Sequence, residues 1–269
     1  MSSQSRLRRL FSPKSVAVIG GGVWCRSVIE QLFKIGYKGK IFPVHPSKKE
    51  ILGLKYFKDL GEVPAKIDAS FVGINRNTTI EVVKKLNDLN AGGAVCFASG
   101  FLEAEEDKQG SGELQKSLIE AAGDMPILGP NCYGFINYLD RSVLWPDQHG
   151  GKPIDRGVAI LTQSSNLAIN ITMQTRGLPI SYIMSVGNQA SLGFSEIGMY
   201  LLSDPRVTAL GLHIEGIGDV RAFEELATKA RKLGKSIVVL KVGKSAEARK
   251  AAQSHTASLA GDAQGAKSL

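Results

Sequence analysis

The chain has 269 residues, of which 43% are hydrophobic and 22% are charged, and it carries a formal net charge of +8. This composition is ordinary for a soluble globular protein, and the length suffices for one large or two medium domains. No apolar run reaches about 18 residues, so we expect no membrane span. The basic N-terminal stretch, MSSQSRLRRLF, lacks the apolar region of a secretory signal.

Cysteine and charge usage narrow the class of protein further. The three cysteines are widely spaced and form no CxxC pair. This argues against a disulfide framework or a metal site and favours a reducing, cytoplasmic location. Lys and Arg are scattered rather than gathered into one stripe, so we expect no nucleic-acid partner. The positive charge equally suits a small polyanionic ligand, such as a nucleotide or coenzyme, or an ordinary solvated surface.

Strand and helix patterns alternate along the chain, which predicts an α/β fold with parallel sheets. The first half contains predicted strands at 15–20, 40–44, 69–74, 93–98 and 126–128, with helices at 27–35, 79–89 and 112–122. Residues 138–156 interrupt the pattern with Pro and Gly and predict a linker, which divides the chain into domains 1–145 and 146–269. The second half contains predicted strands at 157–162, 180–186, 209–214 and 236–242, with helices at 166–175, 194–202 and 220–233.

A glycine-rich turn joins the first predicted strand to the first helix. The turn reads Gly20-Gly21-Gly22-Val23-Trp24-Cys25. It is close to the dinucleotide fingerprint G-x-G-x-x-G, with Cys25 at the third glycine position. Such glycines let the backbone approach a pyrophosphate, which the positive end of the helix also attracts. The same residues are compatible with a plain glycine-rich turn.

The end of the second predicted strand bears on the choice of nucleotide. An NAD site would place Asp or Glu here to hold the ribose hydroxyls. The chain instead has His45 between two prolines, followed by Lys48 and Lys49. This suits an adenosine that carries an extra phosphate, as in NADP or coenzyme A, although both lysines are also compatible with an ordinary surface loop.

Polar side chains follow three further predicted strands. Asn131 follows strand 126–128, Ser164-Ser165-Asn166 follows strand 157–162, and Asn188 follows strand 180–186. The carboxyl ends of parallel strands meet at one edge of a sheet, where open α/β sheets bind ligands. The Ser164–Asn166 run can cap the next helix or hold a phosphate, and both interpretations stand.

Two residues are candidates for the chemistry itself. His255 lies in a loop of small and polar residues near the end of the sequence, a setting in which a histidine is often merely solvated. Glu215 closes an apolar strand, where a carboxylate is costly unless it has a partner or a task. The topology brings both toward the same sheet edge, where Glu215 would fix the tautomer of the His255 imidazole and stabilise its cation. Cys132 has no activating base nearby, so we expect a packed core thiol.

These turns together resemble the NDP-forming acyl-CoA synthetases, a family related to the α subunit of succinyl-CoA synthetase. The resemblance covers nearly the whole chain. Its strongest matches occur in the order PVHPSKKEILGLKYF (43–57), GPNCYGFIN (129–137), LTQSSNLA (161–168), SVGNQASLGF (185–194), IEGIGDVRAF (214–223) and SHTASLAGD (254–262). The last is similar to the family's phosphohistidine loop, with His255 at the phosphorylated position. The resemblance implies a Rossmann-like CoA-binding domain followed by a flavodoxin-like, succinyl-CoA-ligase-like domain.

The resemblance also implies roles. Coenzyme A would contact Gly20, Gly21, Gly22, Val23, Trp24, His45, Lys48 and Asn131. Phosphate and the carboxylic acid would lie near Ser164, Ser165, Asn166 and Asn188, with Glu215 orienting His255. ATP, ADP and Mg²⁺ would act through an ATP-grasp domain or partner subunit that this sequence lacks, so the chain alone should not turn over ATP. We also expect an oligomer and no resident metal. The sequence does not identify the acid substrate, and it does not decide whether the nucleotide is ATP or GTP.

The sequence departs from the family pattern at several positions. Trp24 and its neighbours replace a Gly-Ala-Ser and Pro-Gly-Lys turn, Ser165 replaces a glycine, and Asn75-Arg76 replaces an apolar-Pro pair. These departures support an alternative, a non-catalytic CoA-binding or regulatory module of the same fold. An NADP-dependent oxidoreductase is a third hypothesis, supported by the glycine turn and the two lysines but opposed by the lack of a hydride-transfer constellation.

Overall fold

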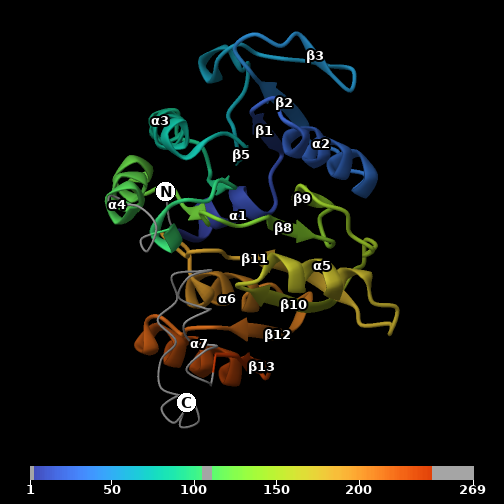
Figure 1. Ribbon diagram of the computed structural model, residues 1–269. Helices are drawn as coiled ribbons and strands as arrows, with labels where there is room; N and C mark the ends of the chain where they lie inside the picture. The colour runs from blue at the N-terminus through green and yellow to red at the C-terminus, as the bar shows by residue number, and fades with distance from the viewer. Residues whose placement is uncertain (1–2, 105–110, 244–269) are drawn as a thin grey trace.

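The computed structural model describes residues 3–104 and 111–243. They form two parts, each a β-sheet with helices packed on it, and one part lies above the other in Figure 1. His255 therefore lies outside the described residues. The first half forms a five-stranded parallel sheet in the order β2-β1-β5-β6-β7. Its strands are β1 (Ser15–Ile19), β2 (Lys40–Val44), β5 (Ala69–Val72), β6 (Ala94–Cys96) and β7 (Ile127–Leu128).

Helices cover both faces of this sheet. They are α1 (Ser3–Phe11), α2 (Val23–Ile35), α3 (Arg76–Asp88) and α4 (Ser111–Ala122). In Figure 1, α2 lies on one side of the sheet, and α3 and α4 lie together on the other. Every residue of β1 and β5 is buried, as expected for parallel strands covered on both faces. A small antiparallel hairpin of β3 (Glu50–Ile51) and β4 (Leu54–Lys55) follows β2, and short 3-10 turns occupy Leu60–Glu62 and Leu102–Ala104.

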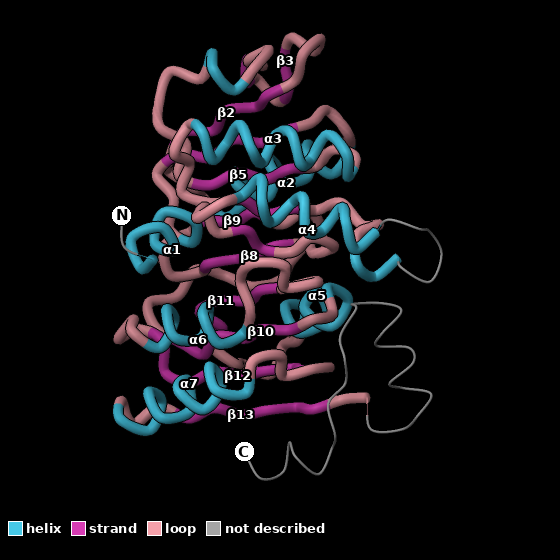
Figure 2. The backbone as a smooth tube through the Cα atoms, turned by 90° about the vertical axis from the view of Figure 1, so that its left-hand side faces the viewer, coloured by secondary structure: helices cyan, strands magenta, loops and turns pink. Residues whose placement is uncertain are grey.

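The second half forms a six-stranded sheet in the order β13-β12-β10-β11-β8-β9. Its strands are β8 (Gly134–Asn137), β9 (Ser142–Leu144), β10 (Gly157–Thr162), β11 (Ile180–Ser185), β12 (Val207–Ile214) and β13 (Ser236–Lys241). The last four are parallel to one another, whereas β8 pairs antiparallel with β11 and with β9. Helices α6 (Phe194–Leu202) and α7 (Val220–Lys232) pack together on one face, and α5 (Ser165–Met173) packs against β10 and β11 on the other (Figure 2). The predicted α/β fold class with parallel sheets is confirmed.

The predicted linker contains secondary structure. Residues 138–156 include β9, which pairs with β8. The turn between them is an Asn-based turn, because Asn137 Oδ1 accepts backbone N–H bonds of 3.0 Å from Leu139 and from Asp140. Strands β8 and β9 precede the predicted boundary at 145/146 yet belong to the second sheet. The division into domains 1–145 and 146–269 stays a prediction.

The two sheets share a hydrophobic core. One cluster of buried side chains runs from Leu32 on α2, through Trp145, to Ile160 on β10. Helix α2 packs directly on β9, so an element of the first half covers a strand of the second sheet. This packing fixes how the carboxyl ends of the two sets of strands face each other, which determines the site described next.

Candidate functional site

The glycine turn forms a tight connection between β1 and α2. Gly20 has a φ of 126°, and a Cβ atom there would lie 2.7 Å from the Gly73 carbonyl oxygen and 2.8 Å from Cys25 Sγ. Gly22 precedes α2 with a φ of −80°, and no side chain caps the helix. The turn therefore presents the backbone at a helix N-terminus, an arrangement that favours an anion.

His45 and Lys48 lie against this turn. Lys48 Nζ donates a hydrogen bond to the Gly21 carbonyl oxygen. His45 Nδ1 accepts backbone N–H bonds of 3.2 Å from Ser47 and from Lys48, which places the neutral imidazole's proton on Nε2. A Cβ on Gly21 would lie 2.6 Å from His45 Cδ2, so the glycine permits the close approach of the two loops.

A cleft of about 310 Å³ opens beside these residues. It is lined by the predicted Gly21, Gly22, Val23 and Lys48 together with Arg26, Glu50, Ile51, Leu52 and Tyr56. The sequence analysis did not identify Arg26 or the β3–β4 hairpin as part of a site, because only the fold brings that hairpin over the glycine turn. The cleft combines a helix N-terminus with Lys48, with Arg26, which is paired with Glu30 at 2.9 Å, and with one carboxylate, Glu50; the helix end and Lys48 suit a phosphorylated ligand.

A larger cavity, of about 700 Å³, lies where the two halves of the molecule meet. It is lined by Trp24, Gly73, Ile74, Asn75, Arg76, Phe97, Ala98, Ser99, Gly100, Asn131, Cys132, Tyr133 and Ser165. The cavity thus brings together three predicted residues from separate parts of the chain: Trp24 at the start of α2, Asn131 in the turn after β7, and Ser165 at the start of α5. Asn75, Arg76, Phe97 and Tyr133 belong to the same space and were not predicted as site residues.

The predicted turn residue Asn188 is tied into a polar network beside this cavity. Its side chain is 9% exposed and accepts a 3.5 Å hydrogen bond from Asn131 Nδ2. Its Nδ2 donates to Glu103 Oε2 and, at 3.3 Å, to Gln115 Oε1. Backbone bonds of 3.0 Å from Asn188 N to Pro130 O and 2.9 Å from Ala190 N to Gly129 O join the two turns. Asn188 therefore positions the Asn131 turn.

The serine run caps α5, one of the two interpretations of that motif. Ser164 is the N-cap and its Oγ accepts a 3.3 Å bond from Leu167 N. Ser165 Oγ lies 2.7 Å from Ser185 Oγ at the end of β11. Asn166 is exposed, and its carbonyl oxygen accepts a 3.0 Å bond from Asn170 Nδ2. A capped helix N-terminus can also hold phosphate, so the second interpretation stays a prediction.

Comparison with known proteins agrees with this two-part architecture. Residues 14–138 match the family described as a CoA binding domain, and residues 155–269 match the succinyl-CoA ligase like flavodoxin domain. The structure superimposes on the dinucleotide forming acetyl-coenzyme A synthetase 1 of Ca. Korarchaeum cryptofilum, solved with phosphate and ADP, with a TM-score of 0.85 and 30% identity. The chain is therefore similar to the NDP-forming acyl-CoA synthetases in both of its parts. That alignment covers 97% of this chain and 57% of the solved one.

The names of some curated relatives denote an α subunit, and those of others do not. The chain is 34% identical to a trans-feruloyl-CoA synthase from an unidentified prokaryote, over 97% of this chain and 38% of the relative. It is 33% identical to the α subunit of ADP-forming acetate–CoA ligase II of Pyrococcus furiosus, over 93% of this chain and 55% of the relative. The chain thus spans roughly a third to somewhat over half of the relatives' length.

Glu215 directly follows β12 and lies in a half-buried polar group. Gln163 Oε1 accepts backbone N–H bonds of 2.6 Å from Glu215 and 3.2 Å from Gly216. His213, two residues earlier, has its Nδ1 3.1 Å from Thr162 Oγ1. Burial lowers the pKa of His213, and the negative charge of Glu215 partly opposes that shift. The sequence analysis missed Gln163 and His213, and the expected pairing of Glu215 with His255 stays a prediction.

The three thiols are buried. Burial raises the pKa of Cys25 to about 11 and that of Cys96 to about 12, and it also raises the pKa of Cys132. Cys132 Sγ lies 3.9 Å from the Cys96 carbonyl oxygen. A neutral, enclosed thiol is a poor nucleophile, so Cys132 is a packed core thiol as predicted.

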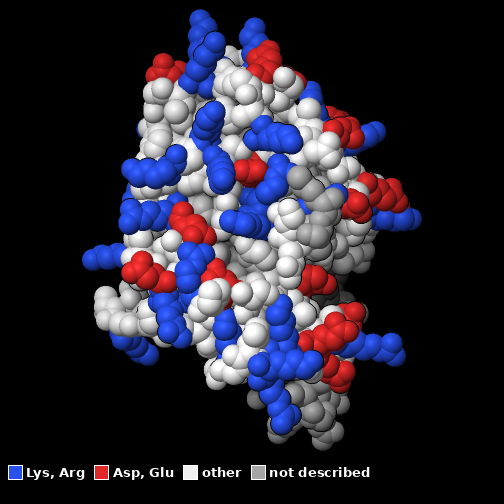
Figure 3. Space-filling view, turned by 180° about the vertical axis from the view of Figure 1, so that it is seen from behind, with Lys and Arg blue, Asp and Glu red and all other residues white. Residues whose placement is uncertain are grey.

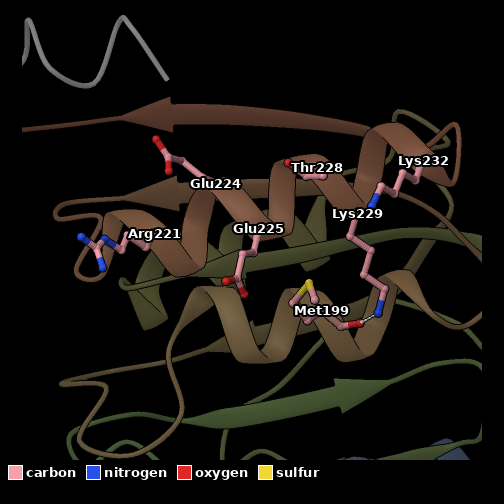
Figure 4. A pocket seen from close by; sticks show the side chains of 7 residues that line it. All are labelled: Met199, Arg221, Glu224, Glu225, Thr228, Lys229 and Lys232. Atoms are coloured by element: carbon pink, nitrogen blue, oxygen red, sulfur yellow. Dashed lines mark hydrogen bonds between the residues drawn. The ribbon is translucent and has the colours of Figure 1, made fainter.

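Other surface features lie apart from these cavities. A hollow of about 670 Å³ lies between α6 and α7, where Lys229 Nζ donates a 2.7 Å bond to the Met199 carbonyl oxygen (Figure 4). Figure 3 shows Lys and Arg spread over the rear face with acidic residues among them. In the described part of the chain, no group of three His, Cys, Asp or Glu side chains is arranged to hold a metal ion, and no helix is long and apolar enough to span a membrane.

Proposed function

We propose that this chain is the coenzyme-binding and phosphohistidine-carrying portion of an NDP-forming acyl-CoA synthetase. The overall reaction would convert a carboxylic acid, coenzyme A and ATP into acyl-CoA, ADP and phosphate. The observation that carries the proposal is the placement of the two cavities. The cationic cleft beside the glycine turn and the larger cavity at the junction of the halves share the start of α2, so one extended ligand can occupy both.

The coenzyme would bind with its phosphates in the cleft. Lys48 and Arg26 supply positive charge there, and the uncapped N-terminus of α2 supplies a positive dipole end. The thiol arm would run past Trp24 and Asn131 into the larger cavity. Because a carboxylate has no good leaving group, the acid must be activated before the thiol can attack it.

The phosphohistidine supplies that activation. An ATP-grasp domain or partner subunit, with Mg²⁺, would transfer a phosphoryl group from ATP to His255. A carboxylate oxygen of the acid would then attack this phosphorus, which breaks the P–N bond, releases the imidazole and gives an acyl phosphate. The coenzyme thiolate attacks the acyl carbon, and inorganic phosphate leaves with the electrons of the C–O bond. Ser165 and the start of α5 line the position where that phosphate would be held.

Calorimetric titration with coenzyme A tests the first part of this proposal, with NADPH as the comparison. We expect saturable binding of coenzyme A at micromolar concentration and none of NADPH. Preferential binding of NADPH would instead support the oxidoreductase hypothesis, and binding of neither would contradict the proposed coenzyme site.

Phosphorylation of His255 separates the synthetase from a non-catalytic module. The chain would be incubated with radiolabelled ATP and the ATP-grasp subunit of a relative. We expect acid-labile label on the wild type and none on His255→Ala, whereas His213→Ala retains the label. Unlabelled wild-type protein that binds coenzyme A would favour the non-catalytic CoA-binding module.

A further inference from the structure

The cavity at the junction of the two halves has an aromatic wall. Trp24, Phe97 and Tyr133 form a triangle of rings, with centroids 5.5 Å apart for Trp24 and Phe97, 6.2 Å for Trp24 and Tyr133, and 5.7 Å for Phe97 and Tyr133. The three interplanar angles lie between 44° and 48°, so the rings are tilted with respect to one another. All three residues line the cavity.

Two of these rings also contact buried aromatic side chains. Phe97 packs on Phe71, a fully buried residue of β5, at 5.6 Å. Tyr133 packs edge-on against the fully buried Trp145 at 5.4 Å. Trp24 differs, because it is 42% exposed at the start of α2. An apolar residue of this size, exposed at the mouth of a cavity, favours a ligand that covers it.

The cavity is also lined by polar groups, and its positive charge comes from one side chain. Among the described residues that line it, Arg76 is the only charged side chain. Its Nη1 donates a 2.7 Å bond to the Gly100 carbonyl oxygen, which anchors one of the five N–H donors of the guanidinium. No carboxylate in the described ranges pairs with it. Ser165 Oγ and the Asn131 amide complete the polar lining.

We propose that this cavity selects an aromatic carboxylic acid as the substrate. The substrate ring would lie against Trp24, Phe97 and Tyr133, and its carboxylate would face Arg76 and Ser165. A volume of about 700 Å³ has room for an aromatic ring and a short chain beside the thiol end of the coenzyme. Aromatic rings gain from tilted contacts with other rings beyond their area burial. This inference rests on the proposed synthetase function.

Calorimetric titration of the 269-residue chain tests the inference. The probes are 3-phenylpropanoate, butanoate and 3-phenylpropan-1-ol, each added with and without saturating coenzyme A. We expect 3-phenylpropanoate to bind at least about tenfold more tightly than butanoate, which offers no ring, and than the alcohol, which offers no charge for Arg76.

A pair of variants on one helix provides the control. Trp24→Ala and Phe33→Ala each remove a half-exposed aromatic side chain from α2, at 42% and 48% exposure, but only Trp24 lines the cavity. Trp24→Ala should lose about tenfold in affinity for the aryl acid, and Phe33→Ala should match the wild type. Arg76→Gln should bind the acid and the alcohol equally. Circular dichroism confirms that each variant is folded.

The remaining outcomes separate this inference from the proposed function. Binding of coenzyme A without a preference for the aryl acid overturns the inference and leaves the coenzyme site intact. Competition between coenzyme A and the aryl acid overturns it as well, because the cavity would then hold only the coenzyme arm. Binding of the aryl acid without any binding of coenzyme A contradicts the proposed function while the aromatic site itself stands.

Discussion

The ammonium group of Lys48 donates a hydrogen bond to the backbone carbonyl oxygen of Gly21, 27 residues earlier in the chain. This bond holds a cation beside the start of α2, where the coenzyme phosphates are expected. We predict that Lys48→Ala weakens coenzyme A binding about tenfold, the size of one lost charge-assisted hydrogen bond. The neighbouring Lys49→Ala should leave the dissociation constant unchanged in the same titration. Equal effects of the two substitutions would mean that Lys48 acts only through net charge.

Gly20 and Gly22 differ in how well their positions tolerate a side chain. Gly20 has a φ of 126° and a crowded Cβ position, whereas a Cβ on Gly22 would meet nothing within 4 Å. Gly20→Ala should therefore lower the free energy of unfolding by about 1–3 kcal/mol, and Gly22→Ala by only a few tenths of a kcal/mol. Urea denaturation measures both. A stable Gly20→Ala protein would show that the turn can adopt another conformation.

Asn188 is expected to act mainly through structure. Its substitution by Ala removes the donor to Glu103 and Gln115 and the acceptor for Asn131 in a buried setting. We predict a loss of about 1–3 kcal/mol in the free energy of unfolding, because buried polar groups would lose their partners. Asn166→Ala, at an exposed position, should be close to neutral. If Asn188→Ala is as stable as the wild type, the network does not hold the Asn131 turn in place.

Asp140 follows β8 and pairs with Arg206, which directly precedes β12. Arg206 donates to Asp140 at 2.7 Å and 3.3 Å, and the Ser12 hydroxyl donates at 2.7 Å. Burial acts to raise the pKa of Asp140, but the hydrogen bonds from Arg206, Ser12 and Asn137 outweigh it and hold the pKa below its ordinary value. The resulting stability is fully present above the unfolded-state pKa, about 3.9, and is lost as the pH falls through the lower folded-state pKa.

Asp140→Asn tests this linkage. At neutral pH it should cost about 1 kcal/mol, since the carboxylate and its Arg206 partner are 30% and 40% exposed and solvent weakens the pair. The difference from the wild type should shrink once the pH falls below about 3.9 and disappear below the lower folded-state pKa of Asp140. Asp155→Asn, at an exposed carboxylate, serves as the control in denaturation curves from pH 7 downward. A difference that grows as the pH falls would give the shift the opposite sign.

The three thiols should resist modification in the folded protein. All are buried, and burial raises the pKa of each. Native protein at pH 8 should show no fast reaction with a chromogenic disulfide reagent, and addition of urea should release three reactive thiols per chain. Rapid reaction of one thiol without denaturant would require a conformation in which that thiol is exposed and ionised.

Much of the fold followed from local pattern. The predicted strands 40–44 and 157–162 and the predicted helix 194–202 coincide with β2, β10 and α6. These segments have a consistent period and clear boundaries, so neighbouring residues decide their structure. The antiparallel pair β8–β9 was missed because Pro and Gly around it are typical of a linker, and the Asn137 turn and the packing of α2 on β9 depend on distant residues.

The sequence by itself determined the alternating α/β order, the glycine turn, the polar strand ends and, by resemblance, the family. These are local features, since each depends on residue types within a few positions. Only the tertiary structure decided that the β3–β4 hairpin covers the glycine turn and that Arg76, Phe97 and Tyr133 line one cavity with Trp24. Residues from separate strand ends meet there because two sheets share one core, and the packing of that core is a property of the whole chain.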